Sequence, residues 1–368
     1  MRKVTMKDVA REAGVSVATV SYVLNDTKKY KISEETKEKV LKVSQELGFV
    51  PNSAAKTLKK QEVSCIGLVI LKQFERNLSD RYSKRMMTSI KEKLSEEGYQ
   101  LMICSGDVDD HGYPDYISYY LERRIGGVIY IVNACQQMTY KELEMIQKYN
   151  VPAVIVDAAK DYENVSNLKL DYYTSTMNFL KYLLEKEKFQ RILCLCPDEA
   201  YQPEKSWEQT NAMQDFAKGK SIPMMLCPVT HVKECDIMDQ TSINIGFERW
   251  MSVYHQVKNY LQKWREGDLV FCANGFLGDS AMAIANVLKK NIMIAVGEEF
   301  QSAPMHWIDY LSKGGRVFID NMQPHRVGVH AAKMMAERLQ TGENQNEVLH
   351  ARIIDFAEQI PIFNSPIE

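Results

Sequence analysis

The chain has 368 residues, of which 45% are hydrophobic and 26% charged, a composition ordinary for a globular protein. Residues 1–60 have a net charge of +6 and the remaining residues −8, which predicts a polyanionic partner for the N-terminal segment alone. The 8 cysteines include no CxxC pair, so a zinc or redox site of that spacing is excluded and buried free thiols are expected. The N-terminus has no secretory apolar region, and no apolar run is long enough to cross a membrane. We therefore expect a cytoplasmic protein.

The first predicted helices lie near the N-terminus. Thr5 followed by Asp8 predicts a capped helix over residues 6–13, and the sequence GVS at 14–16 predicts a tight turn into a second helix. Two helices joined by such a turn are typical of a helix-turn-helix unit.

A third helix should follow after a loop. Ser33 is suited to cap a helix over residues 34–47, which Gly48 ends. Beyond it, SAAKTLKK at 53–60 can form a helix but is too short to be stable alone.

The second helix has an uncharged outer face. Val20, Val23 and Leu24 make its apolar stripe, whereas the opposite face carries small hydroxyl, apolar and amide groups. Small uncharged residues allow a helix to approach base edges in the major groove of DNA, and Lys28, Lys29 and Lys31 would attract phosphates. The alternative is a helix packed against another protein surface.

From residue 64 onward, apolar runs alternate with amphipathic stretches of helical length. This rhythm predicts an α/β core with two doubly wound parallel sheets and a ligand cleft beyond the carboxyl ends of the strands. The runs are 65–71, 99–105, 126–132, 152–158, 191–197, 224–229, 269–274, 292–297 and 316–321.

The motif VTMKDVAREAGVSVATVSYVLN, continued by ISEETKEKVLKVSQELGFVPNSAAKTL, resembles the DNA-binding headpiece of the lactose-repressor (LacI/GalR) family. The strand–helix alternation is similar to that family's periplasmic-binding-protein-like core. The resemblance implies a helix-turn-helix domain over residues 1–50, a hinge helix and linker over 51–62, and a two-lobed effector-binding and dimerisation core over 63–368. It also implies that Leu58 opens the minor groove of a near-palindromic operator.

The resemblance assigns DNA-contacting roles by position. Tyr22 stands where the family often has Arg, and Lys56 replaces the usual hinge Arg, so planar bidentate contacts are lost at both positions. The residues expected to face bases are Val17, Ala18 and Tyr22; those expected at phosphates are Thr5, Ser16, Thr19, Ser21, Asn25 and Lys29; and those expected in the hinge contact are Asn52, Ala55, Lys56 and Leu58.

The core departs further from the family's pattern. The family has Asn-Asp where this chain has Asn274-Gly275, and an Arg that contacts the ligand aligns loosely with Lys205. Each candidate could equally be a surface or hinge residue. The candidate effector contacts are Phe74, Asp107, Tyr172, Lys205, Trp207, Asn274 and Glu299.

Catalytic and cofactor motifs are missing from the sequence. GKS at 219–221 lacks the first glycine of a phosphate-binding loop, and His325 and His330 have no metal spacing. We therefore expect no enzyme, no cofactor and no metal.

The prediction is a homodimeric, sequence-specific repressor of transcription that binds double-stranded operator DNA and a small-molecule effector such as a sugar, with no membrane partner. Two alternatives are control by a partner protein, and a solute-binding protein or enzyme with an incidental headpiece.

Overall fold

The computed structural model describes residues 4–24, 32–49, 63–70, 81–132, 140–157, 161–198, 204–230, 243–297 and 305–356. The chain divides into two compact units, residues 1–63 and residues 64–368. No helix in the described ranges is long and apolar enough to span a bilayer.

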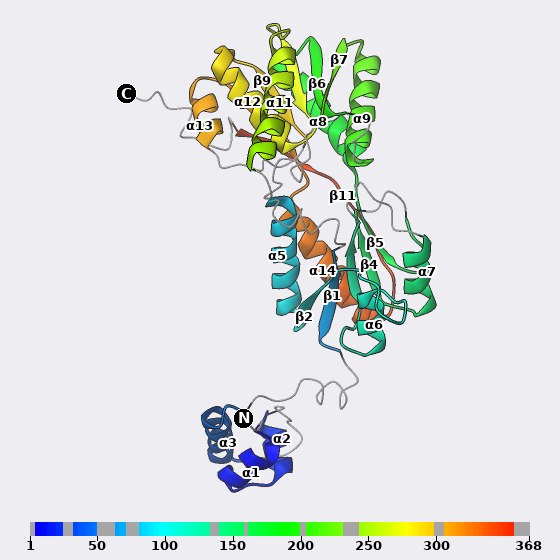
Figure 1. The fold of residues 1–368 in the computed structure, drawn as a ribbon, viewed down its shortest axis with the longest axis vertical. Helices are drawn as coiled ribbons and strands as arrows, with labels where there is room; N and C mark the ends of the chain where they lie inside the picture. Colours follow the sequence, from blue (N-terminus) through cyan, green and yellow to red (C-terminus); the bar gives the residue numbers. More distant parts are fainter. Residues whose placement is uncertain are drawn as a thin grey trace. The chain divides into compact units, whose positions relative to one another are not determined.

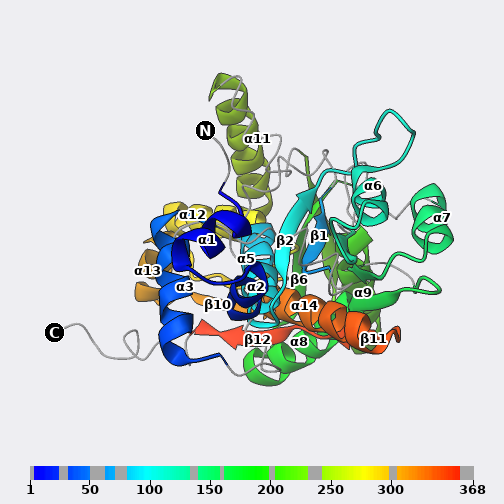
Figure 2. The same ribbon diagram turned by 90° about the horizontal axis from the view of Figure 1, so that it is seen from below.

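The N-terminal unit is a bundle of three short helices, drawn in blue in Figure 2. Its core is formed by Val9, Ala13, Val20 and Val40, which are buried, with Val23 and Leu24 packed against them. The predicted apolar stripe of the second helix is therefore confirmed. The helices are α1 (Met6–Ala13), α2 (Val17–Leu24) and α3 (Glu34–Glu46).

Local hydrogen bonds set the ends of these helices as predicted. The Asp8 carboxylate accepts from the Thr5 N–H at 3.0 Å and from the Thr5 hydroxyl at 2.6 Å. Gly14 ends α1 in the left-handed conformation, φ +66°, which glycine adopts without strain. Ser33 accepts from the Thr36 N–H and caps α3. Each boundary rests on residues a few positions apart in the chain.

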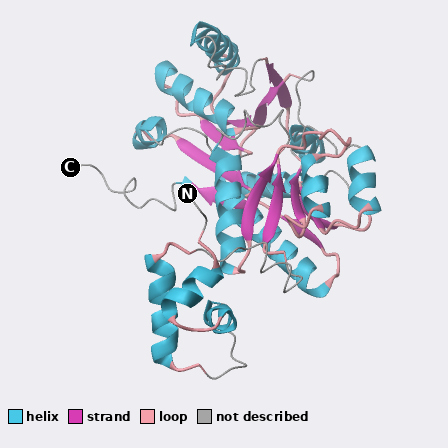
Figure 3. Cartoon of the chain, turned by 60° about the horizontal axis from the view of Figure 1, so that its bottom comes forward, coloured by secondary structure: helices cyan, strands magenta, loops and turns pink. Residues whose placement is uncertain are grey.

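The larger unit contains two six-stranded sheets with helices on both faces (Figures 1 and 3). All neighbouring strands are parallel except β10 and β12. The first sheet has the order β11 (Asn346–Leu349), β5 (Ser166–Leu170), β4 (Ala153–Val156), β3 (Val128–Ile131), β1 (Cys65–Val69) and β2 (Gln100–Cys104). The second has the order β12 (Arg352–Asp355), β10 (Arg316–Asn321), β9 (Met293–Val296), β8 (Asp268–Cys272), β6 (Arg191–Pro197) and β7 (Met224–Val229).

Helices cover both faces of each sheet and so close four apolar layers. In the first sheet, Ile66 and Leu68 face one layer and Val69 faces the other. The period of two thus separates the residues of one strand between two cores. The helices of this unit are α5 (Arg81–Glu96), α6 (Asp115–Leu121), α7 (Tyr140–Lys148), α8 (Tyr172–Glu187), α9 (Glu204–Lys220), α11 (Ile243–Leu261), α12 (Gly275–Leu288), α13 (Met305–Ser312) and α14 (Pro324–Thr341).

Helices α5 and α14 lie side by side on the first sheet (Figure 1). A Cβ atom at Gly328 would lie 2.1 Å from the Ser89 Oγ and 2.5 Å from the Met86 carbonyl oxygen. Only glycine therefore allows the two helices to pack this closely.

The chain crosses between the two sheets three times. It leaves the first sheet after β5, returns through α14 to β11, and leaves again to β12. All nine predicted runs form strands, whereas β5, β11 and β12 were not predicted. The predicted doubly wound architecture is nevertheless correct.

Candidate functional site

The outer face of α2 is the feature of the N-terminal unit best suited to contact another molecule. Val17 has 41% of its surface exposed, and Ala18 and Ser16 are also exposed. Ser21 and Tyr22 are half-buried on the same side of the helix. The residues predicted to face bases and phosphates along α2 are therefore accessible, whereas the buried Val20 lies on the other side.

Ser16 and Thr19 are joined to each other at the start of α2. The Ser16 Oγ accepts from the Thr19 N–H at 3.0 Å and lies 2.9 Å from the Thr19 Oγ1. Each hydroxyl has one hydrogen to donate, and the contact between the two oxygens uses one of them. The pair therefore has one hydroxyl hydrogen left for an outside acceptor such as a phosphate oxygen.

Thr5 lies at the start of α1, where its side chain is exposed. Its hydroxyl donates to the Asp8 carboxylate, so Thr5 offers an outside donor its oxygen rather than its hydrogen. Of the other predicted DNA contacts, Asn25, Lys29, Asn52, Ala55, Lys56 and Leu58 lie outside the described residues.

The candidate effector residues are distributed along the carboxyl ends of the strands. Asp107 follows β2 and is exposed. Tyr172 is only 3% exposed, and its hydroxyl donates to the Asp157 carboxylate at 3.3 Å. Asn274 caps α12 by accepting from the Leu277 N–H at 2.9 Å. Phe74 and Glu299 lie outside the described residues, as do the side chains of Lys205 and Trp207 in the first turn of α9.

Gln209 is a polar residue at this edge that was not predicted from the sequence. Its side chain is buried in α9, and its Nε2 donates to the carbonyl oxygen of Gly297 at 2.7 Å, directly after β9. A Cβ atom at Gly297 would lie 2.6 Å from that Nε2, so a larger residue there would displace the Gln209 amide. The Gln209 Oε1 has no hydrogen-bond partner among the described residues. A buried acceptor left without a donor is unfavourable, and a donor from water, from a residue outside the described ranges or from a ligand would satisfy it.

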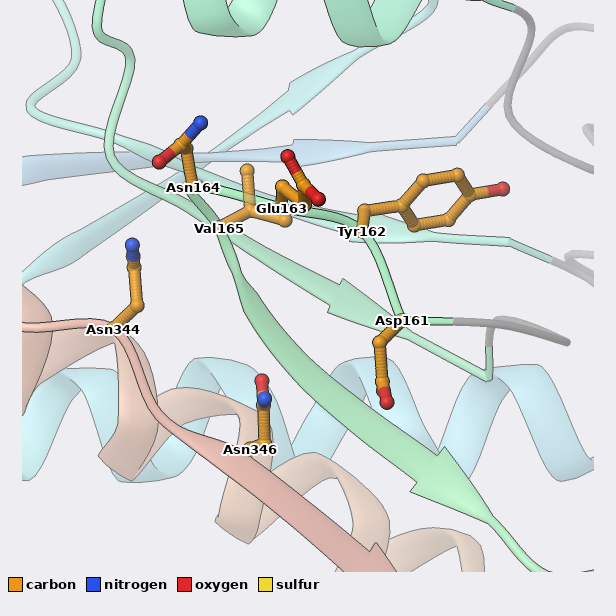
Figure 4. A pocket seen from close by; sticks show the side chains of 7 residues that line it. All are labelled: Asp161, Tyr162, Glu163, Asn164, Val165, Asn344 and Asn346. Atoms are coloured by element: carbon orange, nitrogen blue, oxygen red, sulfur yellow. The ribbon is translucent and has the colours of Figure 1, made fainter.

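A pocket of about 410 Å³ lies at the edge of the first sheet where β5 and β11 begin (Figure 4). Its lining residues directly precede β5 and lie before or at the start of β11, so the pocket is at the amino ends of these strands, away from the predicted cleft. The Asp161 carboxylate there is already paired with Lys169 at 3.0 Å. The pocket contains none of the predicted effector residues; it is lined by Asp161, Tyr162, Glu163, Asn164, Val165, Asn344 and Asn346.

Potential metal ligands do not gather in the described part of the chain, where no group of three or more His, Cys, Asp or Glu could hold an ion.

The fold and the exposed face of α2 together define a helix-turn-helix DNA-binding regulator with a periplasmic-binding-protein-like core.

Comparison with known proteins supports this class. Residues 5–52 match the model of the bacterial regulatory proteins of the lacI family. The chain is 27% identical over 289 residues to the HTH-type transcriptional regulator RegA of Clostridium saccharobutylicum, covering 78% of each protein. It is 30% identical over 196 residues to the HTH-type transcriptional repressor PurR of Vibrio vulnificus, covering 52% of this chain and 54% of that one.

Solved structures support the same conclusion for the fold. A lac repressor dimer bound to operator and the anti-inducer ONPF has a TM-score of 0.68 at 17% identity, covering 96% of this chain and 98% of that one. The regulator CelR in complex with cellobiose has a TM-score of 0.56 at 17% identity, with the same coverage. Residues 5–52 therefore carry the DNA-binding motif of the lacI family, and the chain is similar over most of its length to a transcriptional regulator rather than to an enzyme.

Proposed function

We propose that the protein is a transcriptional repressor that binds a near-palindromic operator as a homodimer. The observation that carries this proposal is the exposed, uncharged face of α2, where Val17 and Ala18 protrude between the hydroxyls of Ser16 and Ser21. A relative of the chain, PurR, is a repressor, and the similar lac repressor structure is a dimer on its operator. One three-helix headpiece reads few base pairs, so two copies are needed for a specific site.

The division of labour within the chain is part of the proposal. Residues 1–50 read the operator, residues 51–62 form the hinge and linker, and residues 63–368 bind the effector and the second copy. Removing residues 1–60 should abolish binding to DNA and leave a folded core, because each unit has its own buried cluster. Retention of operator binding by the truncated chain would contradict this division.

Base reading by α2 can be tested with Tyr22→Ala and a matched Lys29→Ala variant. A duplex selected from a random DNA pool would serve as the operator, together with its single-base variants at several salt concentrations. Loss of Tyr22 should weaken operator binding by about 1–3 kcal/mol and reduce the base preference at one or two positions of the operator. The salt dependence of binding should be unchanged, since Tyr neutralises no phosphate. Loss of Lys29 should weaken all sequences alike and flatten the salt dependence. Unaltered base preference in Tyr22→Ala would contradict the proposed orientation of α2.

Leu58→Ala tests the hinge separately. A side chain inserted into a kinked base step stabilises only the deformed specific site, so its loss should weaken specific binding by a few kcal/mol, roughly the free energy of unstacking one step. Binding to random duplexes should change far less. Equal losses on both would contradict a role in the minor groove.

A ligand in the core cleft is the proposed control. The buried and unpaired Oε1 of Gln209, at the carboxyl edge of the second sheet, supports a ligand that carries hydrogen-bond donors. CelR binds cellobiose, which has many hydroxyl donors. Thermal-shift measurements against sugars, sugar phosphates and nucleobases would identify such a ligand, and Gln209→Leu should abolish its stabilising effect. A ligand whose effect survives Gln209→Leu would contradict this role of Gln209.

A further inference from the structure

The pocket at the amino ends of β5 and β11 (Figure 4) belongs neither to the DNA-binding face nor to the predicted effector cleft. Its volume of about 410 Å³ lies within the range of about 300–1,000 Å³ that is usual for small-molecule sites. One wall is the loop of residues 161–165 before β5, and the other is the segment of residues 344–346 that enters β11. The cavity is therefore large enough for a small ligand, and two segments far apart in the chain form it.

Strand β5 begins with two buried polar residues, and both bond to the walls of the pocket. The Ser166 Oγ accepts from the Gln345 N–H at 3.1 Å. The Asn167 Oδ1 accepts from the Tyr162 N–H at 2.9 Å, and the Asn167 Nδ2 lies 3.0 Å from the Asn346 Oδ1. Buried polar groups are costly unless they are bonded, and the neighbouring strand β4 has only apolar side chains, AVIV. These bonds hold both walls in place before any ligand binds.

The same bonds decide which atom of Asn346 faces the pocket. A side-chain amide accepts through its oxygen and donates through its nitrogen. Because the Asn167 oxygen accepts from a backbone N–H, its nitrogen is the atom that faces Asn346, and Asn346 presents its oxygen in return. This leaves the Nδ2 of Asn346, an exposed residue, to donate into the pocket that Asn346 lines. The start of β11 thus offers a hydrogen-bond donor.

The opposite wall offers acceptors. The Glu163 carboxylate is exposed and has no ion pair among the described residues, whereas the Asp161 carboxylate is paired with Lys169 at 3.0 Å. Two carboxylates and one ammonium leave a net negative charge, which disfavours phosphates and carboxylates as ligands. The Tyr162 ring is only 6% exposed and points away from the two asparagines of the other wall (Figure 4). The lining residues therefore offer no ring face on which a nucleobase could stack.

We propose that this pocket is a second ligand site of the core, and that its ligand is a small neutral polyhydroxyl compound, a polyol or a sugar. A hydroxyl group both donates and accepts, so the hydroxyls of one ligand can bond to the Glu163 carboxylate and to the Asn346 amide nitrogen. An ammonium group has no acceptor for the Asn346 amide, and an anion is repelled by Glu163. This inference depends neither on operator binding nor on a ligand in the cleft.

Backbone amide chemical shifts of the full-length protein, titrated separately with sorbitol, myo-inositol and glucose, test the proposal. At least one of the three should give saturable shifts in residues 161–165 and 344–346, at concentrations up to roughly 100 mM, where a millimolar dissociation constant gives saturation. The same shifts should persist in Gln209→Leu, since that side chain lies at the other edge of the core. Shifts that disappear in Gln209→Leu would place the ligand in the cleft and overturn the proposal.

Asn346→Asp is the sharpest variant, because aspartate keeps an oxygen for the Asn167 Nδ2 and replaces only the donor that faces the pocket. It should weaken binding about tenfold, the scale of one lost hydrogen bond, and Glu163→Gln should do the same. Asn291→Asp adds the same charge at an exposed position outside the pocket, and it should bind as the parent does.

Two results would overturn the proposal. The first is that none of the three compounds gives saturable shifts in the two walls. The second is that Asn346→Asp binds as tightly as the Asn291→Asp control. If Asn346→Asp does not fold, Glu163→Gln decides in its place, and an unchanged affinity in that variant overturns the proposal.

Discussion

The Ser16–Thr19 pair leads to a prediction that separates helix capping from DNA contact. Ser16→Ala removes the side chain that accepts from the Thr19 N–H at 3.0 Å, and the loss of such a cap destabilises a helix by about 1 kcal/mol. All four tryptophans follow residue 200, so tryptophan fluorescence reports unfolding of the core only. Hydrogen exchange at the α2 amides should therefore accelerate about fivefold, while the fluorescence-detected unfolding curve is unchanged.

The effect on operator affinity follows from the single spare hydrogen of the pair. After Ser16→Ala the Thr19 hydroxyl is freed to donate to a phosphate, and after Thr19→Val the Ser16 hydroxyl is freed in the same way. Each single variant should bind with little loss, whereas the double variant should lose a hydrogen bond to a charged group, about 1.5–3 kcal/mol. Fluorescence anisotropy titrations of a selected duplex would give the double-mutant cycle. Losses that simply add would mean that the two hydroxyls contact separate phosphates, and would refute the shared-hydrogen arrangement.

Three further predictions concern the core. Lys289 caps α12 in the left-handed conformation, φ 53°, so Lys289→Gly should stabilise the core by about 0.5–1 kcal/mol in tryptophan-detected urea unfolding, while Lys289→Ala, which keeps the strain, should give no gain. Hydrogen bonds from the Ser118 hydroxyl and the Tyr113 N–H lower the pKa of Asp109, so its stabilising effect is complete above the ordinary aspartate pKa and is lost as the pH falls through the lowered value. Unfolding of Asp109→Asn should therefore depend less steeply on pH in the acid range than that of the parent protein, and equal slopes would contradict the assignment. Burial raises the pKa of the Cys104 and Cys227 thiols to about 12, so peptide mapping should find both unmodified by a thiol reagent at pH 8–9, roughly the range in which free cysteine ionises, until denaturant is added.

The helices of the N-terminal unit were predictable because their signals are local. The contacts that cap α1 and α3, between Thr5 and Asp8 and between Ser33 and Thr36, join residues three positions apart. The stripe of Val20, Val23 and Leu24 is also contained in two turns of one helix. No contact with a distant part of the chain is needed to set where these helices begin and end, so the sequence pattern predicts them correctly.

The missed strands depend on partners that are far away in the chain. β5 has the sequence SNLKL, in which Ser166 and Asn167 are buried although they are polar. The Asn167 amide is satisfied by the backbone of Tyr162 and by the side chain of Asn346, 179 residues later. A short strand buried through such bonds has no apolar run for a sequence analysis to detect.

Gln209 was missed although the sequence did contain a signal. It lies on the stripe of α9 that continues through Ala212, Met213 and Phe216, at intervals of three, four and seven residues. A glutamine on an otherwise apolar stripe must be buried or must break the stripe. The structure shows that it is buried and that it bonds to the end of β9.

Residue type alone could not identify the effector contacts at the carboxyl ends of the parallel strands. Asparagine and aspartate at the carboxyl ends of parallel strands both cap the following helix and bind ligands, so what distinguishes the roles is whether their polar atoms are already satisfied. The Asn274 Oδ1 accepts from the Leu277 N–H, whereas the Gln209 Oε1 has no partner among the described residues. Asn274→Ala should therefore destabilise the core by about 1 kcal/mol, the range for a lost cap, and Asn274→Asp, which keeps the acceptor at the start of α12, should not. Urea unfolding of both variants by tryptophan fluorescence measures this, and an alanine variant as stable as the parent would mean that Asn274 is held for a ligand rather than for its helix.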